Sequence, residues 1–438
     1  MIDKKYHIIT YGCQMNVHDS EKIAGILEEM GYKSVSDIES ADIIVVNTCC
    51  VREHAEVKVY GNVGAMKQLK DVKPNLKIVV CGCMMQQSDA AKKFMDRFPF
   101  VDICIGTSSL HKLPELIRKS FKGSRGLDTT ESTDIQENVS ISRASGIRAW
   151  VSIIYGCNNY CSYCIVPYVR GRERSRNSSA IVDEVKRLAD SGYKEIILLG
   201  QNVNSYGNDL PGEVTFARLL RMLDKIDGIE RIRFMTSHPK DLSDELIDTI
   251  AECPHVCNQL HLPVQSGSNR ILKLMNRGYT RERYLELIDK IRSKVPDIGL
   301  STDVIVGFPS ETEEDFLQTL DLFEKVRFQS SYAFKYSKRK GTAASEMPDQ
   351  VPLEDKKSRL ARLLDLQKRI TLEINEAMLG KIVEVLPESV SVKNSKLLAA
   401  KTDGGIPVVF RGDESMIGVM QKVKITGKRV NVLSGELV

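Results

Sequence analysis

The sequence predicts an α/β protein with three parts: a parallel sheet covered by helices, a partial (β/α)6 barrel, and a small C-terminal β-barrel. Short apolar runs alternate with amphipathic helical stretches through the first 121 residues, and the same alternation restarts at residue 148. After residue 380 only short strand patterns remain. The length of 438 residues agrees, as a soft prior, with about three domains. We therefore expect domains at 1–121, 148–375 and 376–438, with a polar linker at 122–147.

The composition indicates a reducing compartment. The chain has 11 cysteines and a formal net charge of +4, and its first residues do not form a signal peptide. No apolar run is long enough to span a membrane. We therefore expect a cytoplasmic protein, in which clustered cysteines serve as metal ligands rather than as disulfides. The small net charge does not select a partner, so local charge is more informative.

The first part contains four apolar runs that are each followed by a polar or helical stretch. The runs are KYHIITYG, ADIIVVNTC, LKIVVCGC and VDICIGT. In a parallel sheet, ligands collect beyond the carboxyl ends of the strands. Cys13, Cys49 and Cys83 each fall just past one of the first three strands. We therefore expect these cysteines to converge on one edge of the sheet as a three-thiolate site.

A second interpretation of these cysteines is that buried strands use cysteine as a small apolar residue. This interpretation suits Cys81 and Cys104, which lie inside their strands. Cys50 is adjacent to Cys49 and could take its role. The pattern alone leaves both interpretations open.

The middle part contains six strand-like runs, each ending in polar residues. They are AWVSIIYG, KEIILLG, RIRFMTS, CNQLHLPV, GLSTDVIVG and SSYAFKYS. A helical pattern usually follows each run, which is typical of a partial (β/α) barrel. In such barrels the chemistry takes place at the mouth formed by the carboxyl ends of the strands.

Three cysteines follow the first strand of this barrel at the spacing C-x3-C-x2-C. They are Cys157, Cys161 and Cys164. Three thiolates suit a 4Fe-4S cluster and leave its fourth iron open for a reactant. The alternative is a structural zinc site, but zinc usually takes four ligands and no fourth lies close by in the sequence. The spacing therefore favours an iron–sulfur cluster.

Three further features of the sequence lie outside these cysteine motifs. Four arginines in YVRGRERSR predict either phosphate contacts or a solvated surface; they are Arg170, Arg172, Arg174 and Arg176. CPHVC at 253–257 offers two cysteines and a histidine without a fourth ligand, so we expect a structural role. GNVG at 61–64 lacks the preceding strand and the GK[ST] ending of a phosphate loop.

The C-terminal part begins with a long helical pattern at 353–380, which ends at Gly380. Short strands and turns after it predict a five-stranded barrel of the oligonucleotide-binding type. From 381 to 438 there are nine Lys or Arg against six Asp or Glu. This mild excess agrees with a nucleic-acid partner without establishing one. The alternative is a small domain that only supports the larger barrel.

The run GCNNYCSYC resembles the radical S-adenosylmethionine superfamily, in which the amino and carboxylate groups of S-adenosylmethionine chelate the open iron. The resemblance extends to LLGQNVNSYG, RFMTSHP, HLPVQSGS, MNRGYT and DVIVGFPSET. It implies that an aromatic ring before the last cysteine and polar residues at the barrel mouth contact S-adenosylmethionine. The implied contacts are Tyr163, Gly200, Gln201, Asn202, Ser237, Gln265 and Asp303. Any one of them could instead cap a following helix.

The motifs TYGCQMN, NTCCVRE and CGCMMQ resemble the methylthiotransferase family, whose N-terminal domain holds an auxiliary 4Fe-4S cluster. The resemblance implies that Cys13, Cys49 and Cys83 are its ligands. Cys50 stands where that family usually has a small residue, and Cys81 stands two residues before a ligand. The C-terminal segment resembles the TRAM domain, a module that binds RNA.

TYGCQMN and GCNNYCSYCIVPYVRGRERSR are similar to the branch of the tRNA 2-methylthio-N6-isopentenyladenosine synthases. This similarity implies methylthiolation at C2 of N6-isopentenyladenosine, next to the anticodon of tRNA. One S-adenosylmethionine would be the methyl donor and a second the radical source, with sulfur from the auxiliary cluster. A flavodoxin- or ferredoxin-like protein would supply electrons. The resemblance assigns no protein general base.

Three alternatives remain open at this point. The first is a sister enzyme that acts on threonylcarbamoyl-adenosine in tRNA. The second is the branch that modifies an aspartate of a ribosomal protein. The third is a non-catalytic RNA-binding iron–sulfur protein or redox sensor, against which the intact open-iron motif argues.

Overall fold

The computed structural model describes residues 4–50, 53–132, 134–135, 137, 139–143, 146–212 and 214–438, without the side chains of 53–56. The chain divides into two compact units. The first consists of Met1–Ala144, Ile154–Asn158 and Ile165–Arg176, and the second of Ser145–Ile153, Asn159–Cys164 and Asn177–Val438. Within the described residues, no helix is both long and apolar enough to cross a membrane.

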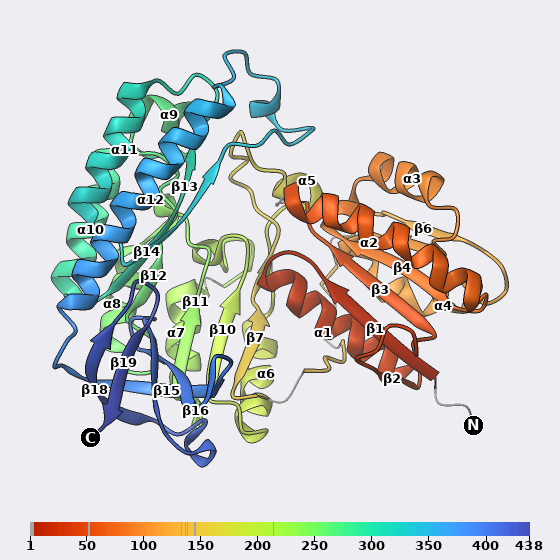
Figure 1. Ribbon diagram of the computed structural model, residues 1–438, viewed down its shortest axis with the longest axis horizontal. Coiled ribbons are helices and arrows are strands. Elements are labelled where there is room, and N and C mark those ends of the chain that lie inside the picture. Colours follow the sequence, from red (N-terminus) through yellow and green to blue (C-terminus); the bar gives the residue numbers. More distant parts are fainter. Residues whose placement is uncertain are drawn as a thin grey trace. The chain divides into compact units, whose positions relative to one another are not determined.

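The first unit is built on a parallel six-stranded sheet with the order β2-β1-β3-β4-β5-β6 (Figure 1). Its strands are β1 (Lys4–Thr10), β2 (Tyr32–Ser34), β3 (Ile43–Thr48), β4 (Lys77–Gly82), β5 (Ile103–Ile105) and β6 (Gly126–Asp128). Its helices include α1 (Gln14–Glu29), α2 (Glu53–Val72), α3 (Ser88–Arg97), α4 (Leu113–Ser120) and the short α5 (Val166–Arg170). The expected sheet is confirmed. Strands β2 and β6 are additional, and β6 lies in the segment expected to be a linker.

The central strand β3 shows why this sheet forms. Its run IIVV is buried on both faces, as expected for a parallel strand covered by helices. Ile44 and Val46 pack in one apolar cluster with side chains of α2 and α3. Ile43 and Val45 pack in the opposite cluster with side chains of α1 and α4. Successive side chains therefore stabilise opposite faces of the sheet.

The second unit contains a half-barrel of parallel strands in two sheets, β11-β10-β7 and β12-β13-β14. A backbone bridge between Ile232 and Val256 links the two sheets. The strands are β7 (Arg148–Ser152), β10 (Glu195–Leu199), β11 (Arg231–Phe234), β12 (Gln259–His261), β13 (Gly299–Val306) and β14 (Ser330–Lys335). The helices are α6 (Ser178–Asp190), α7 (Phe216–Leu223), α8 (Asp244–Glu252), α9 (Asn269–Leu274), α10 (Arg281–Lys294), α11 (Glu313–Val326) and α12 (Leu353–Glu376). All six predicted barrel strands are confirmed.

The chain ends in a closed five-stranded barrel with the order β15-β16-β17-β19-β18, as predicted. Its strands are β15 (Ile382–Ser391), β16 (Asn394–Thr402), β17 (Pro407–Arg411), β18 (Gln421–Lys428) and β19 (Leu433–Leu437). A compact apolar cluster that includes Leu398, Phe410 and Ile425 fills it.

Buried charges join this terminal barrel to the amino ends of the half-barrel strands. Glu195 is paired with Arg148 at 2.9 Å and with Arg233 at 3.0 Å. The Arg233 guanidinium also donates to the carbonyls of Asp403, at 2.7 Å, and Thr402, at 2.9 Å. Burial acts to raise the pKa of Glu195, but the two arginines overcome it and hold the pKa below its usual value. The terminal barrel is therefore part of the second unit and is held to it by buried ion pairs and hydrogen bonds.

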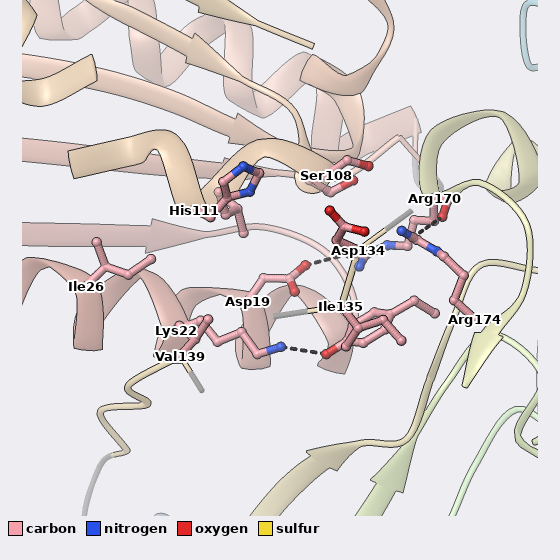
Figure 2. Close-up of a pocket in the computed structure, with 13 residues that line it drawn as sticks. Asp19, Lys22, Ile26, Ser108, His111, Asp134, Ile135, Val139, Arg170 and Arg174 are labelled. Carbon is pink, nitrogen blue, oxygen red and sulfur yellow. Dashed lines mark hydrogen bonds and ion pairs between the residues drawn. The ribbon is translucent and has the colours of Figure 1, made fainter. Parts of the chain in front are cut away.

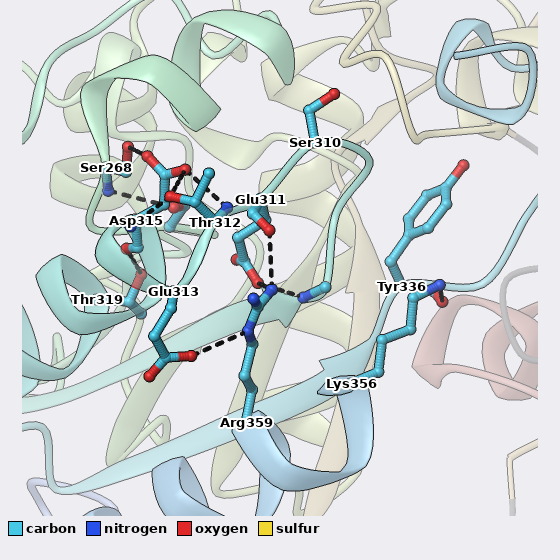
Figure 3. A network of polar contacts seen from close by, with 12 residues as sticks. Ser268, Ser310, Glu311, Thr312, Glu313, Asp315, Thr319, Tyr336, Lys356 and Arg359 are labelled. Carbon is cyan, nitrogen blue, oxygen red and sulfur yellow. Dashed lines mark hydrogen bonds and ion pairs between the residues drawn. The ribbon is translucent and has the colours of Figure 1, made fainter. Parts of the chain in front are cut away.

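A second buried pair holds α12 to the loop after β13 (Figure 3). The Glu311 carboxylate accepts hydrogen bonds from the Gly307 backbone at 2.6 Å and from Arg359 of α12 at 2.8 Å. The loop then enters α11 through a capping box between Thr312 and Asp315. This arrangement fixes the segment that follows one of the strand ends at the barrel mouth.

Candidate functional site

Three cysteines of the first unit lie at one edge of its sheet. Cys13 precedes α1, Cys49 directly follows β3, and Cys83 directly follows β4. Strands β1, β3 and β4 are neighbours in the sheet, and their carboxyl ends meet at the same edge. Gly12 shows how close the loops approach, because a Cβ built there would lie 2.6 Å from the Cβ of Cys49. The convergence expected from the sequence is present, although Val51 and Arg52 of NTCCVRE lie outside the described residues.

The neighbouring cysteines differ from Cys83 in their ionisation. A hydrogen bond from Cys50 lowers the pKa of Cys83 to about 6, with the charge of Arg170 acting in the same direction against burial. The same hydrogen bond, together with burial, raises the pKa of Cys50 well above its usual value. Burial also raises the pKa of Cys81, and that of Cys104 to about 12. Cys83 is therefore more acidic than its neighbour Cys50.

A buried cation stands beside these thiols. Arg170 of α5 is 6 % exposed and lies 2.7 Å from the Asp19 carboxylate (Figure 2). It also interacts electrostatically with Cys83 and Cys13. The sequence had suggested Arg170 and Arg176 as phosphate contacts, and for these two residues the structure contradicts that suggestion. Arg176 is also buried and is paired with Glu137 at 2.7 Å. A run of charges in the sequence does not reveal which members point inward.

The remaining arginines of YVRGRERSR differ from each other. Arg174 donates to the backbone carbonyls of Ser132 and Arg170, so it also makes hydrogen bonds within the first unit. Arg172 is exposed. Of the four arginines considered as phosphate contacts, Arg172 alone is classed as exposed.

Two asparagines hold the cysteine loops, and the sequence analysis assigned them no role. Asn16 donates to the Thr48 carbonyl at 2.7 Å, and its Oδ1 lies 3.4 Å from the Cys13 sulfur. Asn47 donates back to the Asn16 carbonyl at 2.8 Å. Both are fully buried. Their position within TYGCQMN and NTCC, beside the cysteines, was the signal that could have identified them.

The other three cysteines lie on the loop between β8 (Ile154–Tyr155) and α5. In the first unit, the Cys157 N–H donates to the Gly171 carbonyl at 3.2 Å. In the second unit, Arg277 lies 3.3 Å from the Cys161 sulfur and 3.4 Å from the Tyr163 hydroxyl. Arg277 is buried and lies in the quoted motif MNRGYT, but the sequence analysis gave it no role.

The polar residues expected to contact S-adenosylmethionine follow the ends of three half-barrel strands. Gly200, Gln201 and Asn202 follow β10, Ser237 follows β11, and Gln265 follows β12. Asp303 differs, because it lies inside β13, where its carboxylate is 3.5 Å from the Nε2 of His261. This position agrees with the sequence, where Asp303 falls inside the strand-like run GLSTDVIVG.

Several of these side chains have buried polar atoms without partners. Among the described residues, the Asn202 Oδ1, the Ser237 Oγ and the Gln265 Oε1 have no hydrogen-bond partner. A buried polar group without a partner costs free energy, so such atoms suit a polar ligand that would satisfy them. Gln265 also has a positive φ of 69°, and backbone strain of this kind clusters at ligand sites.

His238 adds a fourth buried atom of this kind, which the sequence analysis did not select. Its Nδ1 accepts from the Lys240 N–H at 3.2 Å, which leaves the proton on Nε2. That Nε2 has no partner among the described residues. Burial, with help from nearby cations, lowers the pKa of His238 to about 2, so the ring is neutral.

The cysteines of CPHVC belong to the interior of the second unit. Burial raises the pKa of Cys253, and that of Cys257 to about 12. His255 lies 3.2 Å from the Asp224 carboxylate. Across the part of the chain that the structure describes, no group of three His, Cys, Asp or Glu side chains is placed to hold a single metal ion. The segment GNVG lies inside helix α2.

Three stretches of the chain match known protein families. Residues 151–323 match the Radical SAM superfamily, residues 5–106 match the Uncharacterized protein family UPF0004, and residues 376–438 match the TRAM domain. A parallel half-barrel with a three-cysteine loop after its first strand, matched in this way, defines a radical S-adenosylmethionine enzyme. That class uses a 4Fe-4S cluster and S-adenosylmethionine.

Curated relatives make the assignment more specific. The tRNA-2-methylthio-N(6)-dimethylallyladenosine synthase of Thermoanaerobacter pseudethanolicus is 56% identical, over 99% of this chain and 92% of the relative. The protein of that name in Acetivibrio thermocellus is 54% identical, over 99% of this chain and 91% of the relative. The chain therefore belongs to the family of the tRNA-2-methylthio-N(6)-dimethylallyladenosine synthases. The resemblance recognised in the sequence is confirmed.

Solved structures support the fold alone. The radical S-adenosylmethionine methyltransferase TsrM from Kitasatospora setae matches with a TM-score of 0.57 and 15% identity, over 78% of this chain and 77% of that chain. The cobalamin-dependent S-adenosylmethionine radical enzyme OxsB matches with a TM-score of 0.51 and 12% identity, over 85% of this chain and 56% of that chain.

Proposed function

We propose that this protein methylthiolates C2 of N6-isopentenyladenosine next to the anticodon of tRNA. The observation that carries the proposal is the identity of more than half of all residues, over nearly the whole chain, with relatives named for this reaction. The C2–H bond of adenine is strong and unactivated, so ordinary acid–base groups cannot functionalise it. Such chemistry belongs to cofactors, which the protein positions and shields.

Two 4Fe-4S clusters and S-adenosylmethionine, when bound, supply the radical, the sulfur and the methyl group of this reaction. Cys157, Cys161 and Cys164 would hold the first cluster, and Arg277 would place a positive charge beside it at Cys161. Three thiolates leave one iron open for S-adenosylmethionine. The contacts proposed for that ligand are Tyr163, Gly200, Gln201, Asn202, Ser237, Gln265 and Asp303. The buried atoms of Asn202, Ser237 and Gln265 that lack partners support this assignment.

Cys13, Cys49 and Cys83 would hold the auxiliary cluster. Two features of the first unit fit such a group. The pKa of Cys83 lies near 6, chiefly through the hydrogen bond from Cys50, so the Cys83 thiolate is available at neutral pH. The buried Arg170 supplies a positive charge next to the thiolates. We assign the segments 1–121, 148–375 and 376–438 to the auxiliary cluster, the radical chemistry and RNA binding, and expect a flavodoxin- or ferredoxin-like electron donor.

The ligand assignment can be tested by iron analysis of the reconstituted protein. Two clusters imply about eight irons per chain. Replacing Cys157, Cys161 and Cys164 by Ala should leave about half of this iron and abolish cleavage of S-adenosylmethionine. Replacing Cys13, Cys49 and Cys83 should also leave about half, with cleavage retained. As a matched comparison, Cys50→Ala should keep both clusters. Loss of the auxiliary cluster in Cys50→Ala, with its retention in Cys49→Ala, would reverse the assignment.

The substrate can be tested by mass analysis of nucleosides after incubation with S-adenosylmethionine and a reductant. Four substrates are compared with one enzyme preparation: isopentenylated, threonylcarbamoylated and unmodified anticodon loops, and the ribosomal protein. The apolar isopentenyl tail contributes about 0.8 kcal/mol per buried CH₂, whereas the charged threonylcarbamoyl group pays a desolvation cost. We expect product only from the isopentenylated loop. Equal or greater turnover on threonylcarbamoyl-adenosine would assign the chain to the sister activity.

A further inference from the structure

Strand β14 of the second unit exposes two aromatic side chains on one face. It is an edge strand that pairs with β13, and Tyr332 and Phe334 are 51% and 47% exposed. Side chains two residues apart point to the same side of a sheet. The register places Tyr332 beside Asp303, and the Tyr332 ring contacts His261 edge-on at 5.9 Å between centroids. The exposed aromatic face is thus the face that carries Asp303, a residue proposed above for the cofactor site.

Basic residues follow these aromatics at the carboxyl end of the strand. Lys335, Lys338 and Lys340 are exposed and form no ion pair with any residue that the structure describes. Lys356 of α12 joins them, with its ammonium 5.2 Å from the centre of the Tyr336 ring. Burial lowers the pKa of Lys356, and the positive charges of Lys338 and Lys335 lower it further. Lys335 and Lys338 therefore lie close enough to Lys356 to interact with it.

The carboxylate that interacts with Lys356 has other partners. The Glu311 carboxylate, which interacts with Lys356, is already hydrogen-bonded to Arg359 and to the Gly307 backbone. Figure 3 shows Lys356 and Tyr336 apart from the Glu311–Arg359 pair. We define the β14 surface as Tyr332, Phe334, Lys335, Lys338, Lys340 and Lys356.

Exposed aromatics beside unpaired cations suit a single-stranded nucleic acid. Unpaired bases stack on aromatic rings, while phosphates pair with lysines. A base-paired helix keeps its bases stacked on each other and could use only the cations. An exposed aromatic edge strand is also a liability unless something covers it. We propose that the β14 surface holds the single-stranded RNA loop that contains the target nucleoside. This proposal rests on the proposed function.

The β14 surface takes over a role that the sequence had suggested for the arginine run. Arg170 and Arg176 are buried in ion pairs, so they are not available to phosphates. Five residues of the β14 surface, in contrast, are exposed, and they lie on or just after a strand whose carboxyl end belongs to the barrel mouth: Tyr332, Phe334, Lys335, Lys338 and Lys340. In this arrangement Tyr332 and Phe334 stack on loop bases, and the lysines contact the phosphates that flank them.

The test uses the full-length, cluster-loaded protein and an isopentenylated anticodon stem-loop labelled for fluorescence anisotropy. Tyr332→Ala and Phe334→Ala should each weaken binding by about tenfold, without changing the salt dependence. The triple variant Lys335→Gln, Lys338→Gln, Lys340→Gln should weaken binding and reduce the slope of log K against log salt by about two. Cleavage of S-adenosylmethionine without RNA should survive in all variants, which shows that they are folded.

Matched controls come from other exposed residues. Phe121→Ala removes a ring that is 48% exposed in the first unit, and a triple exchange of Lys186, Lys225 and Lys368 for Gln removes three exposed lysines. Both controls should bind RNA like the wild type. Equal RNA affinity in Tyr332→Ala, Phe334→Ala and the wild type would overturn the proposal. It would also be overturned if the β14 variants lost binding to a ribosomal-protein substrate and kept their binding to RNA. If the wild type modifies RNA while the β14 variants bind it normally, only the β14 surface fails. If the wild type neither binds nor modifies RNA, the proposed function fails.

Discussion

The half-barrel of the second unit buries polar groups of different kinds at its two ends: ion-paired charges at the amino ends, and neutral groups without partners at the carboxyl ends. At the amino ends of β7, β10 and β11, the Glu195 carboxylate is paired with two arginines. Those arginines come from the neighbouring strands, and Arg233 also reaches the terminal barrel. At the carboxyl ends of β10 and β11, Asn202 and Ser237 have buried polar atoms with no partner among the described residues.

This contrast distinguishes buried groups that stabilise the fold from buried groups that are placed to bind a ligand. Buried charges that are paired and hydrogen-bonded hold one specific arrangement, and removing one partner is strongly destabilising. Buried polar atoms without partners cost stability and persist where a ligand will complete them. The amino end of the half-barrel therefore holds the terminal barrel, and the carboxyl end is prepared for a ligand.

The largest expected effect concerns the amino end. Arg233→Ala leaves the Glu195 carboxylate with one arginine and removes the hydrogen bonds to Asp403 and Thr402. We expect the free energy of unfolding to fall by about 3 kcal/mol, because a buried charge loses one of its two partners. Urea denaturation measures this change. Deleting residues 376–438 would leave the same arginine without these carbonyls, so point variants are the cleaner test.

Arg221→Ala is the matched control for that experiment. Its ion pair with Glu252 has the similar length of 2.7 Å but is exposed, with side-chain exposures of 37% and 60%. Exposed pairs contribute about 0–1 kcal/mol. A loss in Arg233→Ala no larger than that in Arg221→Ala would show that the buried junction is not what stabilises the second unit.

The second expected effect compares two buried glutamates. The pKa of Glu195 is held below its usual value, whereas burial raises the pKa of Glu311, in the loop after β13, to about 7. A carboxyl whose folded pKa is raised binds its proton more tightly when folded, so it favours folding at low pH. That contribution is lost as the pH rises from about 4.5 to about 7, by on the order of 3 kcal/mol.

Glu311→Gln removes this titration. Relative to the wild type, the variant should be more stable at pH 8 than at pH 5, by on the order of 3 kcal/mol. Denaturation curves at several pH values measure the difference. Glu313→Gln, which alters an exposed neighbour that also contacts Arg359, should show a constant difference from the wild type. A constant difference in Glu311→Gln as well would mean that Glu311 is ionised throughout.

The sequence was most informative where the chemistry is local. Cys157, Cys161 and Cys164 fall within eight residues, and their spacing alone favoured an open-iron cluster. Cys13 and Cys49 required the resemblance, because strand-end position does not distinguish a ligand from a core cysteine. Periodicity also predicted the six barrel strands and the terminal barrel, since buried strands carry their own apolar pattern.

The sequence was least informative where partners are distant. Arg233 and Asp403 are 170 residues apart, so no local sequence pattern predicts their contact. Arg170 was expected either to contact phosphate or to be solvated, because a run of charges in a sequence does not show which members are buried. A sequence also does not show which side chains are exposed to solvent. Tyr332 and Phe334 were therefore not distinguished from other residues of the strand.

The smallest expected effect tests the carboxyl end directly. Ser237→Ala removes a buried hydroxyl that has no partner among the described residues, so stability should stay the same or rise by up to about 1 kcal/mol. If that hydroxyl completes the S-adenosylmethionine site, affinity for this ligand should fall about five- to tenfold, the value of one hydrogen bond. Equilibrium dialysis of the cluster-loaded protein measures the affinity, and denaturation of the same preparation measures the stability.

Thr249→Ala is the matched control, because the Thr249 hydroxyl donates to the Glu245 carbonyl at 2.7 Å. It should lose about 1 kcal/mol of stability at unchanged ligand affinity. Ser237→Ala therefore changes the ligand affinity, whereas Thr249→Ala changes the stability. This is the expected difference between a buried hydroxyl without a partner and one that is hydrogen-bonded. A Ser237→Ala protein that loses stability and keeps its affinity would place Ser237 among the structural residues.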